Sequence, residues 1–389
     1  MVKNEIRLPL IVRISFILLF LILSFYILVE FKFYLTPLTL GILFAYLLFP
    51  VAHFFEKRGV ARIIANLIAI IMGLTVVYGV GFIFYRQFRV FLDDLPALKH
   101  QASLNINTMF GTVEKYFDIQ TGGLRSEVSK IIQDFFESPG KTWQAAFGAT
   151  FNTLFSVFIM PVYVFFLLYY RDKFREFVLM LVPDNKHPVA ERIINDVNSV
   201  TIRYMTGVFI VVSILVVVNS VGFLIIGLDY AILLGAIAAI MNFIPYYGTI
   251  IGYSFPFFYA FFVMDSPHYA FWVVIQFVIV QFSENNILTP NIVGLHVNIN
   301  PFMIILAITL GGVVWGVPGM FIAVPVITVI RVLGENIDHL SPLGFLLGQS
   351  GTEQHSLNTR KIQRFFRFSR ISARRKLNRM RQRSRSKTT

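Results

Sequence analysis

The chain begins with three apolar stretches, each close to the length that a helix needs to cross a bilayer. They cover about residues 14–29, 34–52 and 63–85. A helix crosses the hydrocarbon core with roughly 20 apolar residues, and a segment in lipid must satisfy its own backbone hydrogen bonds. Only 14% of the residues are charged, against roughly 25% in soluble domains. We therefore predict an all-α, polytopic membrane protein.

Two further full spans are predicted at about residues 147–170 and 205–226. Residues 86–146 separate the third span from the fourth. They have balanced charge and helically spaced apolar residues, which predicts a small helical domain outside the membrane. Residues 171–204 form an apolar stripe at helical spacing and predict an amphipathic cytoplasmic linker. The predicted organisation is therefore spans one to three in 1–85, the outer domain in 86–146, and spans four and five in 147–226.

Basic residues predict the orientation of these spans. Lys3, Arg7 and Arg13 precede the first span, and the short loop at 56–62 is net positive. The positive-inside rule puts both on the cytoplasmic side. The N-terminus resembles a signal peptide, but no small-residue cleavage site follows, so we expect an uncleaved first helix.

The net charge of +13 belongs to the end of the chain. Residues 360–387 contain thirteen Lys and Arg and no acidic residue. We predict that residues 346–389 are a disordered cytoplasmic tail that touches anionic lipid. The alternative is a tail that binds RNA or a protein partner. For the fold itself we predict no nucleic-acid binding.

Residues 227–345 have a different pattern and form the predicted transport region. Two apolar segments, at about 229–264 and 301–332, are interrupted by NFIPYYG at 242–248 and GGVVWGVPG at 311–319. Their arms are short for a bilayer crossing, whereas 269–288 between them is a full span. A pair of Pro- and Gly-interrupted segments indicates a transporter binding site. Each segment is either a re-entrant helical hairpin, which the arm lengths favour, or one broken helix that crosses once.

The span between the broken segments ends in the polar sequence QFSENNILTP at 281–290. Hydrocarbon tolerates such a cluster where it faces protein or a water-filled cavity. Glu284 could bind a cation, carry a proton or accept hydrogen bonds from a polyol; alternatively it has a structural pairing role. Helical spacing puts Gln281 and Asn285 on one side. Asn286 points about 100° away from Asn285, which favours a bond between helices for Asn286.

These considerations define the candidate site residues. The predicted substrate-binding residues are Asn242, Tyr246, Tyr247, Gln281, Glu284, Asn285, Asn286, Thr289 and Trp315. The predicted hinge or hairpin-tip residues are Pro245, Gly248, Pro290, Gly316, Pro318 and Gly319. The tyrosines could instead be aromatic anchors at the membrane interface. We predict no metal site, no cofactor and no enzyme activity, because the sequence has no cysteine, P-loop or nucleophile elbow.

The motifs at 242–248, 281–290 and 311–325 resemble those of the AI-2E (autoinducer-2 exporter) transporter family. The likeness extends over roughly residues 10–345. The resemblance implies a bacterial inner-membrane protein with two helical hairpins and cytoplasmic termini. It also implies a homo-pentamer whose protomers work by an elevator-like movement. Some members of the family resemble autoinducer-2 exporters, and others resemble sodium/proton antiporters.

Three functions remain as predictions from the sequence. The leading one is a secondary transporter that exports a small polar solute, such as an autoinducer-2-like signal. The first alternative is a sodium/proton antiporter that uses Glu284, with a monovalent cation as its partner. The second is a structural or channel-like membrane oligomer.

Overall fold

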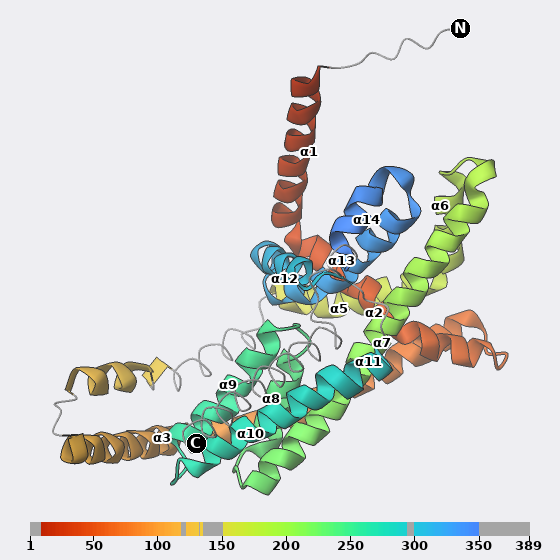
Figure 1. Cartoon of the computed structure of the whole chain (residues 1–389). Helices are drawn as coiled ribbons and strands as arrows, with labels where there is room; N and C mark the ends of the chain where they lie inside the picture. The colour runs from red at the N-terminus through yellow and green to blue at the C-terminus, as the bar shows by residue number, and fades with distance from the viewer. Residues whose placement is uncertain (1–8, 118–121, 132, 135–150, 294–298, 350–389) are drawn as a thin grey trace, which may run out of the picture. The chain divides into compact units, whose positions relative to one another are not determined.

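The chain is helical almost throughout the part that the structure describes. This computed structural model describes residues 9–117, 122–131, 133–134, 151–293 and 299–349 (Figure 1). Within those residues no β-strand occurs, and five helices are long and apolar enough to cross a membrane. They are α2 (Lys32–Glu56), α3 (Arg62–Phe117), α7 (His187–Ile226) with the turn before it, α10 (His268–Ser283) with its continuation to Ile292, and α13 (Val317–Asn336). The predicted all-α, polytopic membrane fold is confirmed.

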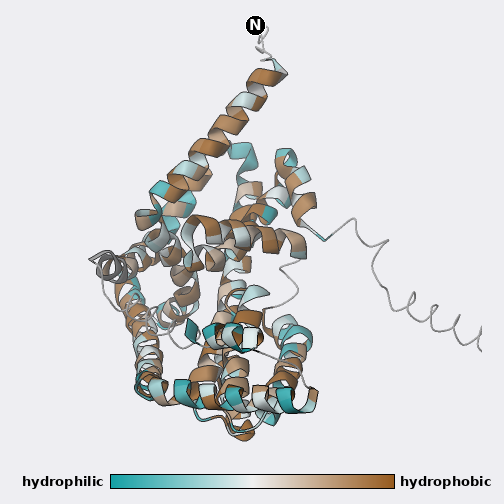
Figure 2. Cartoon of the chain, turned by 90° about the vertical axis from the view of Figure 1, so that its left-hand side faces the viewer, coloured by the Kyte–Doolittle hydropathy of each residue, from teal (hydrophilic) through white to brown (hydrophobic). Residues whose placement is uncertain are grey.

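Besides a helical segment at residues 122–131, the structure describes eleven further helices or helical turns. They are α1 (Leu10–Glu30), α5 (Phe151–Tyr169), α6 (Arg171–Met180), η1 (Asp184–Lys186), α8 (Ala231–Met241), α9 (Tyr247–Phe262), η2 (Glu284–Leu288), α11 (Thr289–Ile292), α12 (Pro301–Trp315), η3 (Asp338–Leu340) and α14 (Ser341–Leu347). Figure 2 shows that α1 is hydrophobic along most of its length. Its side chains are also exposed, as at Phe20 (70%). A helix that is apolar on all sides belongs in lipid or in a large core.

Helix α3 is much longer than a membrane crossing. Its 56 residues extend about 84 Å, so the predicted third span and the start of the predicted outer domain form one helix. Its second half holds the base of the α8–α9 pair. Asn105 Nδ2 lies 3.0, 3.1 and 3.2 Å from the carbonyl oxygens of Phe262, Val263 and Met264. The Tyr230 hydroxyl donates to a carboxylate oxygen of Asp94 at 2.6 Å.

The predicted boundary between the linker and the fifth span also falls inside one helix. Helix α7 runs from the predicted linker at 171–204 directly into the predicted fifth span. The division into domains stays a prediction. Residues 118–121, 132 and 135–146 of the predicted outer domain lie outside the described residues, as do the start of the fourth span at 147–150 and residues 350–389 of the predicted tail.

Both broken segments fold back on themselves as helical hairpins. In the first, α8 and α9 pack along each other through glycines. A Cβ atom on Gly248 would lie 1.7 Å from the Met241 carbonyl oxygen, and one on Gly252 would lie 2.8 Å from that of Ala238. The step forward along α9 from Gly248 to Gly252 corresponds to a step back along α8 from Met241 to Ala238, so the two arms are antiparallel. The interrupted segment therefore does not cross the membrane as one broken helix.

The second hairpin, α12–α13, has the same construction. A Cβ atom on Gly319 would lie 2.0 Å from the carbonyl oxygen of Gly311. Gly316 connects the arms with φ 66° and ψ −141°, a conformation open to glycine and strained for other residues. The glycine and proline residues that break the sequence pattern are therefore the residues that let the arms approach and turn.

We predict that Gly248→Ala destabilises the first hairpin. The obstacle to the added Cβ atom is backbone, which cannot rotate away, so we expect a loss of about 3 kcal/mol in the free energy of unfolding. The control is Gly79→Ala on α3, where a Cβ atom meets nothing within 4 Å. That variant should not lower stability, because alanine is the better helix former. Thermal unfolding of the detergent-purified variants measures both, and equal melting temperatures would contradict the prediction.

Candidate functional site

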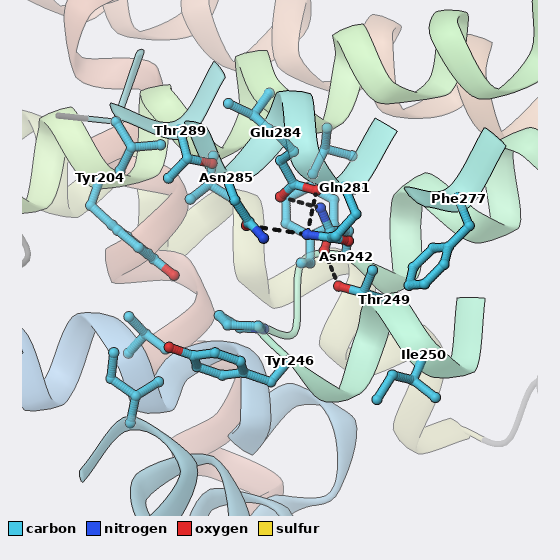
Figure 3. A pocket seen from close by; sticks show the side chains of 18 residues that line it. Tyr204, Asn242, Tyr246, Thr249, Ile250, Phe277, Gln281, Glu284, Asn285 and Thr289 are labelled. Atoms are coloured by element: carbon cyan, nitrogen blue, oxygen red, sulfur yellow. Dashed lines mark hydrogen bonds between the residues drawn. The ribbon is translucent and has the colours of Figure 1, made fainter. Parts of the chain in front are cut away.

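A cavity of about 460 Å³ lies where α7, the tip of the first hairpin, the end of α10 and the second hairpin meet (Figure 3). Small-molecule sites typically occupy roughly 300–1,000 Å³. Its lining residues are Tyr204, Val208, Val211, Val212, Asn242, Phe243, Pro245, Tyr246, Thr249, Ile250, Phe277, Gln281, Glu284, Asn285, Thr289, Val293, Ile304 and Val324. Polar side chains come mainly from the hairpin tip and from α10, whereas α7 and the second hairpin supply mostly aliphatic ones.

A π-helical turn, η2, determines which residues of the α10–α11 segment face the cavity. Phe277, Gln281, Asn285, Thr289 and Val293 all line it, at intervals of four residues. In an uninterrupted α-helix such a row turns by about 40° at each step and by about 160° over its length. The π turn is wider and absorbs part of this rotation. It therefore keeps the row facing one space.

The sequence explains why the helix widens at this point. Pro290 has no N–H group to donate to the carbonyl oxygen four residues earlier, at Asn286, and its ring would clash with that oxygen. The five residues Glu284–Leu288 form the π turn directly before it. Pro290, a predicted hinge residue, thus has a local structural role next to the cavity.

A chain of hydrogen bonds joins the hairpin tip to the π turn (Figure 3). Asn242 Nδ2 donates to Glu284 Oε1 at 2.7 Å, and the Thr249 hydroxyl donates to Asn242 Oδ1 at 2.8 Å. Gln281 Nε2 lies 3.4 Å from Glu284 Oε2 and 3.1 Å from Asn285 Oδ1. Two neutral amides therefore orient the carboxylate, and the stronger bond comes from the hairpin.

Tyr246 is held at the hairpin tip in a strained backbone conformation. Its φ is 66° and its ψ is −60°, and the Tyr247 N–H group donates to the Pro245 carbonyl oxygen at 2.8 Å. This is a γ-turn of the rare, positive-φ form. Within the described residues, no other non-glycine residue has a positive φ. Such strain costs about 1–3 kcal/mol and clusters at functional sites.

The structure brings together six of the nine predicted substrate-binding residues around this cavity. They are Asn242, Tyr246, Gln281, Glu284, Asn285 and Thr289, and the predicted tip residue Pro245 joins them. Tyr247, Asn286 and Trp315 do not line it. Asn286 Nδ2 donates to the Phe282 carbonyl oxygen at 2.8 Å within its own helix. Substrate binding by any of the nine stays a prediction.

The tip of the second hairpin lies away from the cavity. Trp315 Nε1 donates to the carbonyl oxygen of Leu28 in α1 at 2.8 Å. Gly316, Pro318 and Gly319 are not among the lining residues. The hairpin contributes Ile304 and Val324 from its arms instead. The two hairpins therefore differ in their relation to the site, although their sequence patterns are alike.

Sequence reasoning missed the residues that α7 contributes. Tyr204 lines the cavity and is only 6% exposed, but it lies at the end of the predicted surface linker. The close approach of α7 depends on Gly207, where a Cβ atom would lie 2.8 Å from the Cα atom of Val293. A single glycine in a long apolar helix gives little warning of such a contact. Thr249 and Phe277 were also missed.

We predict that the strain at Tyr246 is measurable by comparing two variants. Tyr246→Gly and Tyr246→Ala both remove the ring, but only glycine relieves the positive φ. The glycine variant should be more stable by about 1 kcal/mol, after allowing for the extra backbone entropy of glycine.

The matched control for this prediction is the same pair of substitutions at Tyr247, the first residue of α9. Its φ is not positive, so glycine should be the less stable replacement there. Thermal unfolding of the four purified variants measures both differences. If the glycine variant is less stable than the alanine variant at both positions, the predicted strain at Tyr246 is refuted.

Comparisons with known proteins agree with the predicted resemblance. The model of the family described as "AI-2E family transporter" matches residues 15–338. "Putative transport protein YrrI" of Bacillus subtilis (strain 168) is 29% identical over 304 residues, which cover 76% of this chain and 84% of that protein. "Putative permease PerM" of Escherichia coli (strain K12) is 23% identical over 325 residues, covering 81% and 90%. With the family model spanning both hairpins and the polar turn between them, the chain belongs to the AI-2E family of membrane transporters.

Proposed function

We propose that this chain is a secondary transporter that exports a small polar solute through the cavity beside Glu284. The observation that carries the proposal is the meeting of a re-entrant hairpin tip with a polar π turn at one cavity. Irregular backbone at membrane depth belongs beside a cavity or inside protein. Helices interrupted beside a central cavity are a common way to build a transport site.

The wider setting of the proposal follows from charge and from the family. The membrane is the bacterial inner membrane. Both termini are cytoplasmic, because basic segments favour that side of the membrane. The transporting unit is a homo-oligomer, a pentamer by resemblance to the family. Each protomer exposes its cavity to the two sides in turn by an elevator-like movement. The basic tail contacts anionic lipid.

An autoinducer-2-like signal is the first solute to test. Amide and hydroxyl groups of Gln281, Asn285 and Thr289 line one side of the cavity. Such groups donate and accept hydrogen bonds without a net charge. They therefore suit a small solute rich in hydroxyl groups.

We predict that Asn285→Ala impairs export in cells that lack the chromosomal gene. Loss of one hydrogen bond to the solute corresponds to about 1.4 kcal/mol, or about a tenfold higher KM. The control is Asn291→Ala, because Asn291 Nδ2 donates to the Ile287 carbonyl oxygen at 2.7 Å and the residue does not line the cavity.

Autoinducer-2 inside and outside the cells, at matched expression of the variants, measures the effect. We expect the control to restore export and Asn285→Ala to restore it poorly. If gene deletion itself leaves the distribution of autoinducer-2 unchanged, the proposed export of this signal is wrong.

Sodium/proton antiport is the second candidate function. The observation that favours it is a single carboxylate surrounded by amide groups, which could hold a proton and a cation in alternation. Proteoliposomes with an internal pH dye and an imposed sodium gradient test this function. We expect proton flux that depends on sodium and is abolished by Glu284→Gln. Flux that survives this substitution would count against a role for Glu284.

A further inference from the structure

We infer that the solute of this cavity is an amphipathic organic monocation, an amine or ammonium compound with an apolar body. Its charged end meets Glu284, and its body lies among aromatic and aliphatic side chains. This inference rests on the proposed transport function of the same cavity and narrows its substrate class from polar solutes to cations.

The charge of the cavity wall favours a cation. Of the eighteen lining residues, all in the described part of the chain, Glu284 is the single acidic residue and none is Lys, Arg or His. The partners of its carboxylate, Asn242 and Gln281, are neutral and orient the group without balancing its charge. A charge in a site shielded from water acts more strongly than one in bulk water. The wall therefore attracts cations and repels anions.

The two carboxylate oxygens of Glu284 are unevenly hydrogen-bonded. Oε1 accepts the 2.7 Å bond from Asn242, whereas Oε2 has only the 3.4 Å contact with Gln281. The same Gln281 nitrogen lies closer to Asn285 Oδ1, at 3.1 Å. Charge-assisted bonds between nitrogen and oxygen are typically about 2.7–2.9 Å long. Oε2 is therefore the oxygen with most capacity to accept such a bond from an ammonium group.

The rest of the cavity wall is aromatic and aliphatic in large part. Four aromatic rings line the cavity, those of Tyr204, Phe243, Tyr246 and Phe277. The face of an aromatic ring attracts a cation, and its area covers apolar surface. Aliphatic side chains of α7 and of the second hairpin complete the wall. These side chains cannot bond hydroxyl groups, so this part of the wall suits the apolar body of an amphipathic solute.

The volume of the cavity separates an organic cation from an inorganic one. The cavity of about 460 Å³ is many times larger than the roughly 30 Å³ that a water molecule occupies in the liquid. A bare sodium ion would fill little of it and would contact few of its apolar side chains. An amine with an aromatic or branched body fits both the volume and the wall.

Tyr204 provides an observation that is independent of Glu284. Its side chain is only 6% exposed and comes from α7, on another wall of the cavity. In Figure 3 its hydroxyl group points into the cavity. Within the described residues no hydrogen-bond partner accompanies this hydroxyl group. The hydroxyl oxygen is not fully enclosed by protein, so it is open to the cavity and can bond a polar substituent on the body of the amine.

The test uses the absence of cysteine from the chain. In the variant Val208→Cys, one thiol lies at a half-buried position on the cavity wall, and its alkylation by a small maleimide reports whether the cavity is filled. The probes are phenethylamine, 2-phenylethanol and phenylacetate, which have similar bodies and are cationic, neutral and anionic at neutral pH. We expect phenethylamine to slow alkylation at a concentration at least about tenfold lower than 2-phenylethanol. Phenylacetate should protect least.

Two further variants test whether Glu284 causes any preference for the cationic probe. In the Val208→Cys background, Glu284→Gln should remove the advantage of the amine over the alcohol. Glu191→Gln changes a surface carboxylate that pairs with Arg175 at 2.8 Å and should retain it. Size-exclusion profiles and alkylation rates without probe should match the parent, which establishes that both variants fold.

Several results would overturn the inference. They are equal protection by amine and alcohol, stronger protection by the anion, protection by none of the probes, or an amine preference that survives Glu284→Gln. These failures are distinguishable from failure of the transport proposal. If export depends on Asn285 but the probes show no charge preference, the inference of a cationic solute is wrong and the transport proposal stands. If the cavity prefers the amine but gene deletion leaves export of the signal unaffected, the proposed export of the signal is wrong and the inference of a cationic solute stands.

Discussion

The hydrogen bond between Asn242 and Glu284 joins the two irregular parts of this membrane protein. Asn242 lies where α8 ends, and Glu284 lies where α10 widens into a π turn. A carboxylate near a membrane-spanning helix is costly unless it has partners or faces a polar cavity. Here the amide of a helical hairpin supplies the closest partner, at 2.7 Å. The bond therefore stabilises both the irregular hairpin tip and the π turn.

This bond depends on close packing elsewhere in the first hairpin. The tip is positioned because α8 and α9 approach each other at Gly248 and Gly252, where larger residues would meet backbone atoms. Its base is held by the second half of α3, through Asn105 and Asp94. The tip itself has little regular structure and includes the strained Tyr246. Rigid arms thus carry a strained turn to the cavity, and this arrangement lets a short segment position several polar groups.

The sequence was sufficient to predict the parts of the fold that depend on local pattern. Arm length and the Pro and Gly interruptions favoured hairpins, and helical geometry separated Asn285, which lines the cavity, from Asn286, which bonds its own helix. It was not sufficient for contacts between distant helices. The position of Tyr204 depends on the crossing of α7 and α11 at Gly207. The second tip looked equivalent to the first, but its distance from the cavity depends on packing against α1.

The same bond suggests how solute binding and movement of the hairpin are coupled in the proposed transporter. A cation at Oε2 of Glu284 neutralises part of the carboxylate charge and so weakens the bond that Oε1 accepts from Asn242. The hairpin tip is then held less strongly by its closest partner across the cavity. By linkage, a solute that loosens the tip binds more tightly to the conformation in which the tip is already loose. One carboxylate shared between solute and hairpin is therefore sufficient to make occupancy of the cavity alter the stability of its wall.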